Sequence, residues 1–457
     1  MTIAFVLNGA HALRARDILA AMAWLGLVAI APPAMALAPG EDGVQVTVPV
    51  SGIGDIAQAV AVDPDGNIVL AGTNGGASSV LVRLTPAGGL DNSFGTSGIA
   101  INDLSPSRGD ELRALVGRNG GGYLACGKFN NAAGTGFDFV IARFTDTGAL
   151  EPAFNGVGYV VTPFAAVNAF DQCNALIVQS DGMIVAAGVT TVGGHSHVAV
   201  ARYTTSGVLD SNFGTGGLVD INAAATSGDS EARALVLQPD GKLLVAGYAT
   251  GAGNYDLLVM RLSATGLLDP SFGTGGITRT QVGTSEDIAN AMVLQPDGRI
   301  VLAGSTYAAD GHRDFVLARY TSAGVLDPSF GTGGLVTTPV GPSDDYAYAL
   351  TLMPWGRLVA AGSARIDTST AGTDLAVVAY NADGSLDRFF GIGGKRMVDV
   401  SAFTDVVYAL VGDIGGARFW TVGTAYGSLS TAQDFLAVEF GLPDTIFRYG
   451  LDSATAP

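Results

Sequence analysis

The sequence predicts an all-β fold, a seven-bladed β-propeller with four antiparallel strands in each blade. A phrase of the form LDPSFGTGG occurs six times, and its phenylalanines, from Phe94 to Phe390, lie 58 to 60 residues apart. A second phrase, of the form QPDGKLLVAG, follows the same period and ends seven times in a glycine, from Gly72 to Gly423. Each repeat holds four short strand-like stretches separated by turn residues. Self-similarity at this period is typical of solenoids and propellers, and four strands per repeat favour the propeller.

The N-terminus has the features of an export signal. Arg14 and Arg16 precede an apolar run over residues 18–30, and two prolines and an A-x-A site follow. The run is shorter than the ~20 residues that a membrane span needs, so residues 1–36 are interpreted as a secretory signal peptide rather than an anchor. We therefore expect a secreted, periplasmic or cell-surface protein with no transmembrane segment in the mature chain.

Within each repeat, the order of the strands can be predicted. In the fourth repeat the first two strands are joined by a Pro-Asp-Gly turn, in which proline fixes φ and glycine accepts a positive φ. Repeats two, six and seven depart most, with Asn119-Gly120, Trp355-Gly356 and Ile414-Gly415 in its place. The strand before this turn carries alanines at matched positions, such as Ala232 and Ala289, which suit the crowded centre of a propeller. This strand should be innermost, and the strand after SFGTGG outermost. The seventh repeat lacks an outermost strand, and residues 43–48 should supply it and close the ring without an exposed edge.

The domain boundaries follow from the repeats. The propeller should span residues 43–441, followed by a C-terminal tail over residues 442–457. The predicted blades are approximately 51–103, 107–164, 168–222, 226–281, 284–340, 343–400, and 402–441 plus 43–48.

Composition and motifs limit the possible functions. The chain has 23 Lys and Arg against 41 Asp and Glu, a net charge of −18, and such a chain repels phosphate backbones. Nucleic-acid partners are therefore not expected. The sequence has no G-x-S-x-G, H-E-x-x-H or P-loop motif, so it offers no catalytic set of these kinds.

The repeated phrases, together with the ARY or ARF strand around Arg143, Arg202 and Arg319, resemble the delta-60 repeat family. The resemblance covers roughly residues 43–440. It implies a bacterial protein with a β-propeller fold. The family has no assigned biochemical function, so the resemblance brings no catalytic residues.

The two ends of the blades should differ in role. The Pro-Asp-Gly and SFGTGG turns lie at one end, which we call the repetitive face. The loops between the second and third strands lie at the other end and differ from repeat to repeat, and we call this end the variable face. Turns that repeat from blade to blade are expected to maintain the fold, whereas loops that vary on a rigid scaffold are where binding residues are usually found. A protein, a glycan or a small ligand is therefore expected to bind the variable face.

One candidate site consists of aspartates that precede the innermost strand in six of the seven repeats. They are Asp55, Asp110, Asp171, Asp287, Asp345 and Asp405. Clustered carboxylates suit a hard cation such as calcium, and these could form a cation or ligand ring at the channel mouth. The alternative is that each aspartate binds backbone N–H groups where its strand begins. Three positions later, polar residues are placed to line the channel or to pair with the ring: Gln58, Arg113, Asn174, Arg233, Asn290, Tyr348 and Tyr408.

Two further pairs could carry chemistry. Cys126 and Cys173 replace small apolar residues in adjacent repeats, and they form either two buried thiols or a disulfide in an oxidising compartment. His195 and His197 form the sequence's H-x-H, but two imidazoles alone are a weak metal signal.

These observations favour a secreted, non-catalytic and monomeric binding or scaffold module. Two alternatives remain open: a cation-dependent hydrolase or lactonase that uses the aspartates with calcium, and a lectin-like adhesion module.

Overall fold

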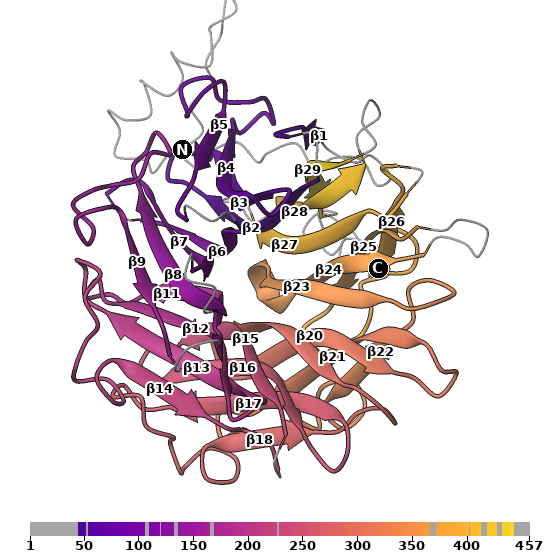
Figure 1. The fold of residues 1–457 in the computed structure, drawn as a ribbon. Helices are drawn as coiled ribbons and strands as arrows, with labels where there is room; N and C mark the ends of the chain where they lie inside the picture. Colours follow the sequence, from indigo (N-terminus) through magenta and orange to yellow (C-terminus); the bar gives the residue numbers. More distant parts are fainter. Residues whose placement is uncertain are drawn as a thin grey trace, which may run out of the picture. The chain divides into compact units, whose positions relative to one another are not determined.

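The computed structural model of the chain describes residues 44–51, 54–105, 109–118, 120–131, 136–164, 169–225, 228–365, 372–401, 403–412, 418–426 and 432–442. The predicted signal peptide and, apart from Leu442, the predicted C-terminal tail lie outside these residues. The described residues form seven β-sheets arranged as the blades of a propeller, which confirms the predicted fold (Figure 1).

Blades 1 to 3 follow one another along the chain. Blade 1 contains β2 (Asp55–Val62), β3 (Ile68–Asn74), β4 (Ser78–Leu84) and β5 (Ile99–Asn102). Blade 2 contains β6 (Glu111–Gly117), β7 (Tyr123–Asn130), β8 (Gly136–Phe144), β9 (Tyr159–Thr162) and β10 (Ala169–Phe170). Blade 3 contains β11 (Gln172–Val178), β12 (Ile184–Val192), β13 (His195–Tyr203) and β14 (Leu218–Ile221).

Blades 4 to 7 complete the ring. Blade 4 contains β15 (Ser230–Leu237), β16 (Leu243–Thr250), β17 (Tyr255–Leu262) and β18 (Ile277–Thr280). Blade 5 contains β19 (Ile288–Leu294), β20 (Ile300–Tyr307), β21 (Arg313–Tyr320) and β22 (Leu335–Thr338). Blade 6 contains β23 (Tyr346–Leu352), β24 (Leu358–Ala364), β25 (Asp374–Tyr380) and β26 (Lys395–Val398). Blade 7 contains β27 (Val406–Gly412), β28 (Arg418–Tyr426), β29 (Gln433–Gly441) and β1 (Gln45–Val48).

The ring closes as the sequence predicts. The innermost strands β2, β6, β11, β15, β19, β23 and β27 contact one another in this order, and β27 contacts β2. Strand β1 pairs antiparallel with β29 and is the outermost strand of blade 7. The short β10, which pairs in parallel with β8, was not predicted. Within the described residues, the helical content is one 3₁₀ turn, η1 (Pro354–Gly356), and no helix is long and apolar enough to cross a membrane.

The core lies between the blades rather than inside them. Seven clusters of buried apolar residues each combine side chains from two neighbouring blades. Alternating strand residues point to opposite faces of a sheet, so both faces of every blade are buried against a neighbour. A single blade therefore cannot bury its apolar surface without the next one.

A repeated arginine connects each of five blades to the next. Arg261 donates to the Asp269 carboxylate at 2.9 Å and to the Ser322 carbonyl of the next blade at 2.7 Å. Its guanidinium lies 4.8 Å from the centre of the Phe272 ring. A Cβ on Gly324 would lie 2.7 Å from that ring, so the next blade's turn needs a glycine here. Equivalent arginine–carboxylate pairs are present in five blades: Arg83–Asp91, Arg143–Glu151, Arg202–Asp210, Arg261–Asp269 and Arg319–Asp327.

The two cysteines meet at the boundary of blades 2 and 3. A disulfide joins Cys126 of β7 and Cys173 of β11, whose Cα atoms are 5.8 Å apart. Both side chains are fully buried. A disulfide here adds a covalent link to the apolar packing between these two blades.

Candidate functional site

The six candidate aspartates all lie at the start of innermost strands, and all are 0% exposed. Each carboxylate accepts backbone N–H bonds from the segment that precedes its strand. Asp345, for example, accepts bonds from Val340 and Gly341 at 2.7 and 3.0 Å. The same arrangement holds for the others: Asp55, Asp110, Asp171, Asp287 and Asp405.

This geometry is that of the backbone-binding alternative, in which the aspartates fix the connections between blades. Calcium binding by these side chains stays a prediction. Among the described residues, one group of three acidic side chains is close enough to share an ion, and its ligand oxygens lie within 4.8 Å of one another. It consists of Asp374, Asp399 and Asp405. The other five candidate aspartates belong to no such described group.

Burial changes the acidity of these groups. Loss of solvent raises the pKa of Asp110 and of Asp345 to about 6, although backbone N–H bonds oppose the shift. Burial also raises the pKa of Asp405. A buried carboxylate favours its neutral form because the charge is poorly solvated there.

The seven polar residues that follow the aspartates line the central channel. In every blade the pairing of the first two strands shifts by one residue, which makes the polar residue the extra residue of a β-bulge: Gln58, Arg113, Asn174, Arg233, Asn290, Tyr348 and Tyr408. A bulge re-aims one side chain and often occurs beside functional sites. The glycine that ends the second phrase faces this bulge in each blade.

Side chains from distant blades interact inside the ring. Arg233 of blade 4 acts electrostatically on Tyr348 of blade 6, and Arg113 of blade 2 acts on Tyr408 of blade 7. Blades that are not neighbours can meet in this way only across the central channel. Burial raises the pKa of Tyr348 to about 12, so its hydroxyl stays protonated at neutral pH.

Contacts between neighbouring blades also link these side chains. Arg233 donates to the Asn290 side chain at 2.6 Å, and Asn290 donates to the Ala347 carbonyl at 2.7 Å. The rings of Tyr348 and Tyr408 lie 5.5 Å apart. The residues at the bulges are therefore tied to their neighbours by hydrogen bonds at Arg233 and Asn290 and by an aromatic contact at Tyr348 and Tyr408.

A group of tyrosines gathers beside the channel at the variable face, mainly on blades 4 to 6. Tyr248 and Tyr255 lie 4.5 Å apart, and the stacked rings of Tyr346 and Tyr348 lie 6.0 Å apart. Together with Tyr307, these side chains form what we call the tyrosine cluster. Apart from Tyr248, which is 9% exposed, its members are partly exposed.

Two tyrosines of the cluster, Tyr307 and Tyr346, contact one arginine. The guanidinium of Arg313 lies 4.3 Å from the centre of the Tyr307 ring and 5.6 Å from that of Tyr346. Its Nη2 forms an ion pair with Glu286, and its backbone N–H donates to the Asp344 carboxylate at 2.9 Å. Arg313 is only 8% exposed, and its Nη1 has no hydrogen-bond partner among the described residues.

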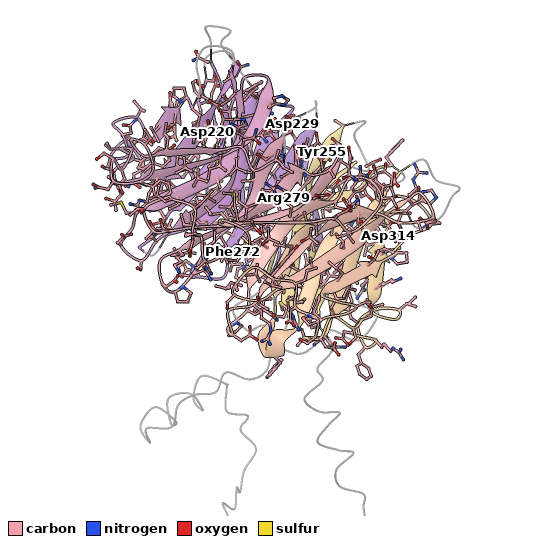
Figure 2. The ribbon with its side chains drawn as sticks, turned by 90° about the horizontal axis from the view of Figure 1, so that it is seen from below. Asp220, Asp229, Tyr255, Phe272, Arg279 and Asp314 are labelled. Carbon is pink, nitrogen blue, oxygen red and sulfur yellow. A yellow bond between two sulfur atoms is a disulfide. The ribbon has the colours of Figure 1, made fainter. Side chains whose placement is uncertain are left out.

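Acidic side chains accompany the tyrosines on the same three blades. Glu286 and Asp344 directly precede the repeated aspartates Asp287 and Asp345 of blades 5 and 6, and Asp229 holds the equivalent place before Ser230 of blade 4. The other blades carry Gly54, Gly109, Phe170 and Thr404 there. The phenol of Tyr255 interacts with Asp229, and the two residues lie together in Figure 2.

This cluster was not found from the sequence, except for Tyr348 among the channel residues. Its tyrosines occupy different positions of the repeat, so they give no periodic signal. The signal that could have found them is the departure of blades 4 to 6 from the other repeats at positions next to the variable loops.

The two histidines have separate carboxylate partners. Nδ1 of His197 lies 2.7 Å from Asp220, and Nδ1 of His195 lies 3.6 Å from Asp229. No group of three potential metal ligands in the described part of the chain includes a histidine.

Comparisons with known proteins agree with the fold. Residues 64–94, 179–213, 238–272 and 295–330 match the family model "Domain of unknown function (DUF5122) beta-propeller". These matches support a propeller repeat family of unknown function. No curated protein matches the chain.

Solved structures give distant similarities. Sqt1 from Chaetomium thermophilum is 13% identical, with 87% of this chain and 100% of that chain covered and a TM-score of 0.42. A protein of unknown function from Bacteroides caccae is 11% identical, with 73% and 94% covered and a TM-score of 0.36.

Proposed function

We propose that the protein is an exported, non-catalytic binding module whose ligand site is the tyrosine cluster at the variable face. The observation that carries this proposal is the asymmetry of the ring. The arginine–carboxylate pairs recur in five blades and the channel bulges in all seven, as expected for features that maintain the fold. The tyrosines with Arg313 and its acidic neighbours are confined to a few adjacent blades.

The composition of the cluster supports binding. Tyrosine offers a large, rigid and amphipathic contact surface at a low cost in conformational entropy, and it is enriched in binding sites together with arginine. The scaffold beneath is a closed ring of sheets, which holds these side chains in fixed positions.

The binding role can be tested by a screen that does not assume one ligand. Labelled protein is screened against a glycan array and a displayed peptide library, and hits are measured again with the double variant Tyr307→Ala, Tyr346→Ala. We expect a loss of about tenfold or more in affinity. Val325→Ala, a change of an exposed side chain on the repetitive face, should leave binding unchanged. Hits that depend on Val325 and not on the tyrosines would contradict the proposal.

Export is tested separately, because it rests on the N-terminal sequence. A fusion of residues 1–40 to a reporter that is active only outside the cytoplasm should be active. N-terminal sequencing of the mature protein should show cleavage after Ala36. An inactive reporter and an uncleaved chain would contradict export.

A further inference from the structure

We propose that the ligand of the tyrosine cluster is an uncharged saccharide chain, which lies across blades 4 to 6 and places a hydroxyl oxygen on Arg313. This inference rests on the proposed binding role and adds the chemical class of the ligand.

The first step is the unused donor of Arg313. The side chain is held between Tyr307 and Tyr346 and is tied to Glu286, so its orientation is fixed. Its buried Nη1 makes no hydrogen bond of ordinary geometry in the described chain, and the phenol of Tyr307 is the nearby group that interacts with the guanidinium besides Glu286. A buried guanidinium N–H without a well-placed acceptor is costly, so an outside oxygen that reaches Nη1 when the ring of Tyr307 shifts would relieve this cost.

The second step is the charge around that donor. Glu286 and Asp344 flank Arg313, and their side chains are 42% and 43% exposed. Asp229, at 37%, continues the acidic row on blade 4. Carboxylates accept hydrogen bonds and repel anions, and the whole chain carries −18. A ligand that accepts from Arg313 must therefore do so without a negative charge, and it must donate to carboxylates nearby. Hydroxyl groups do both.

The third step is the aromatic surface. Tyr255, Tyr307 and Tyr346 are partly exposed beside these polar groups. A pyranose ring has C–H groups on its faces and hydroxyl groups around its edge, so it can stack on a tyrosine while its edge meets the carboxylates and Arg313. Aromatic surfaces with a few fixed polar groups are the usual composition of ligand sites.

The fourth step is the repetition across blades. The acidic side chain occupies the same repeat position in three consecutive blades, at Asp229, Glu286 and Asp344. Equivalent positions in neighbouring blades follow one another around the ring. A ligand that meets all three is a chain of several sugar units, not a single sugar. Affinity should therefore grow with chain length.

Titration calorimetry with defined probes tests the proposal. The probes are neutral gluco-, xylo-, manno- and chito-oligosaccharides of one to six units, anionic galacturonate oligomers of the same lengths, and a lysine-rich peptide. We expect at least one neutral series to bind, with affinity rising about tenfold or more from one unit to three. The anionic oligomers should bind at least about tenfold more weakly than the neutral series that binds.

Variants locate the site. Arg313→Lys and Tyr307→Ala should each lower affinity for the neutral oligomer about tenfold or more, whereas Tyr307→Phe should keep most of it because the ring remains. Arg299→Lys is the matched control, since this arginine binds Asp297 and Asp327 on the repetitive face. Thermal unfolding of each variant confirms that it is folded.

The outcomes separate the two proposals. Binding of the peptide or a protein, but of no neutral oligosaccharide, through Arg313 and Tyr307 would overturn the saccharide inference and leave the binding role intact. Tighter binding of the anionic oligomers would also overturn it. No binding that depends on either residue, in these titrations or in the array and peptide screens, would overturn both proposals.

Discussion

Replacement of Gly304 by alanine should strongly destabilise the propeller. Gly304 lies on β20, opposite the bulge of β19. A Cβ at this position would lie 1.8 Å from the Ile288 carbonyl oxygen and 2.9 Å from the Cα of Ala289. Both neighbours are backbone atoms, so no side-chain rotation can relieve the contact. One strand must move by roughly 1.5 Å to restore ordinary van der Waals separation.

The magnitude follows from what this movement breaks. The register pairs Ile288 with Ser305 and Ala289 with Gly304 at this point. Loss of two ladder hydrogen bonds costs about 1 kcal/mol each, and the overpacked contact adds about 1–3 kcal/mol. Gly304→Ala should therefore lower the free energy of unfolding by about 3–5 kcal/mol.

The assay is urea unfolding, followed by far-ultraviolet circular dichroism and tryptophan fluorescence. The matched control is Gly89→Ala. Gly89 is exposed, does not need a left-handed conformation, and has only the Thr85 Oγ1, at 3.7 Å, near the position of a new Cβ. This control should change stability by no more than about 0.5 kcal/mol. If Gly304→Ala costs as little as the control, the close approach at the bulge does not constrain the fold and the reasoning is refuted.

Three other predictions concern the disulfide, the buried carboxylates and the arginine between blades. The denatured protein should show no free thiols before reduction, and reduction of the Cys126–Cys173 bridge should lower the free energy of unfolding by about 2–4 kcal/mol; free thiols in the unreduced protein would contradict the bridge. Burial raises the pKa of Asp110 and Asp345 to about 6, so the folded state favours their neutral forms. Their protonation therefore stabilises the folded state fully below about pH 4, and this contribution is lost as the pH rises through 6. Unfolding free energies measured from pH 4 to 8 should fall with this slope, and Asp345→Asn should flatten it; an unchanged slope would show that the group does not titrate there. Arg261→Gln should cost about 2–4 kcal/mol in urea unfolding, because it removes the ion pair with Asp269 and the bond to the Ser322 carbonyl of the next blade, although Lys242 and Ser271 still bind Asp269. A cost below about 1 kcal/mol would mean that solvent or these partners replace the arginine.

The blade architecture could be predicted because seven repeats share one sequence pattern, although not every repeat carries every phrase. Each Pro-Asp-Gly turn and each SFGTGG phrase reports a local backbone geometry, and the repeat supplies several independent copies of it. Ring closure could be predicted because the seventh repeat lacks an outermost strand and the N-terminal strand belongs to no repeat. The pairing of β1 with β29 agrees with this prediction. Strand β10 escaped prediction because two residues carry no periodic pattern.

The chemistry of the variable face could be predicted only in part. The aspartates were identified, but their role depends on burial, which a sequence pattern does not report. Asp345 is 0% exposed and bound to backbone N–H groups, and a different loop would have left the same residue in solvent. The tyrosine cluster was not predicted because its members become neighbours only when different strands of adjacent blades meet, as Tyr307 and Tyr346 do around Arg313.

The seam between β1 and β29 has a mechanical consequence. The strands are antiparallel, with Gln45 opposite Val438 and Val48 opposite Phe435, so the chain enters and leaves this pair at the same end. Tension applied to the two flanking segments therefore separates β1 from β29 by breaking their backbone hydrogen bonds one after another, instead of loading all of these bonds at once in shear. The other outermost strands are each joined to their blade by a turn and are not loaded first. A propeller tethered at both ends should open at this seam under a small load, long before its blades lose their structure.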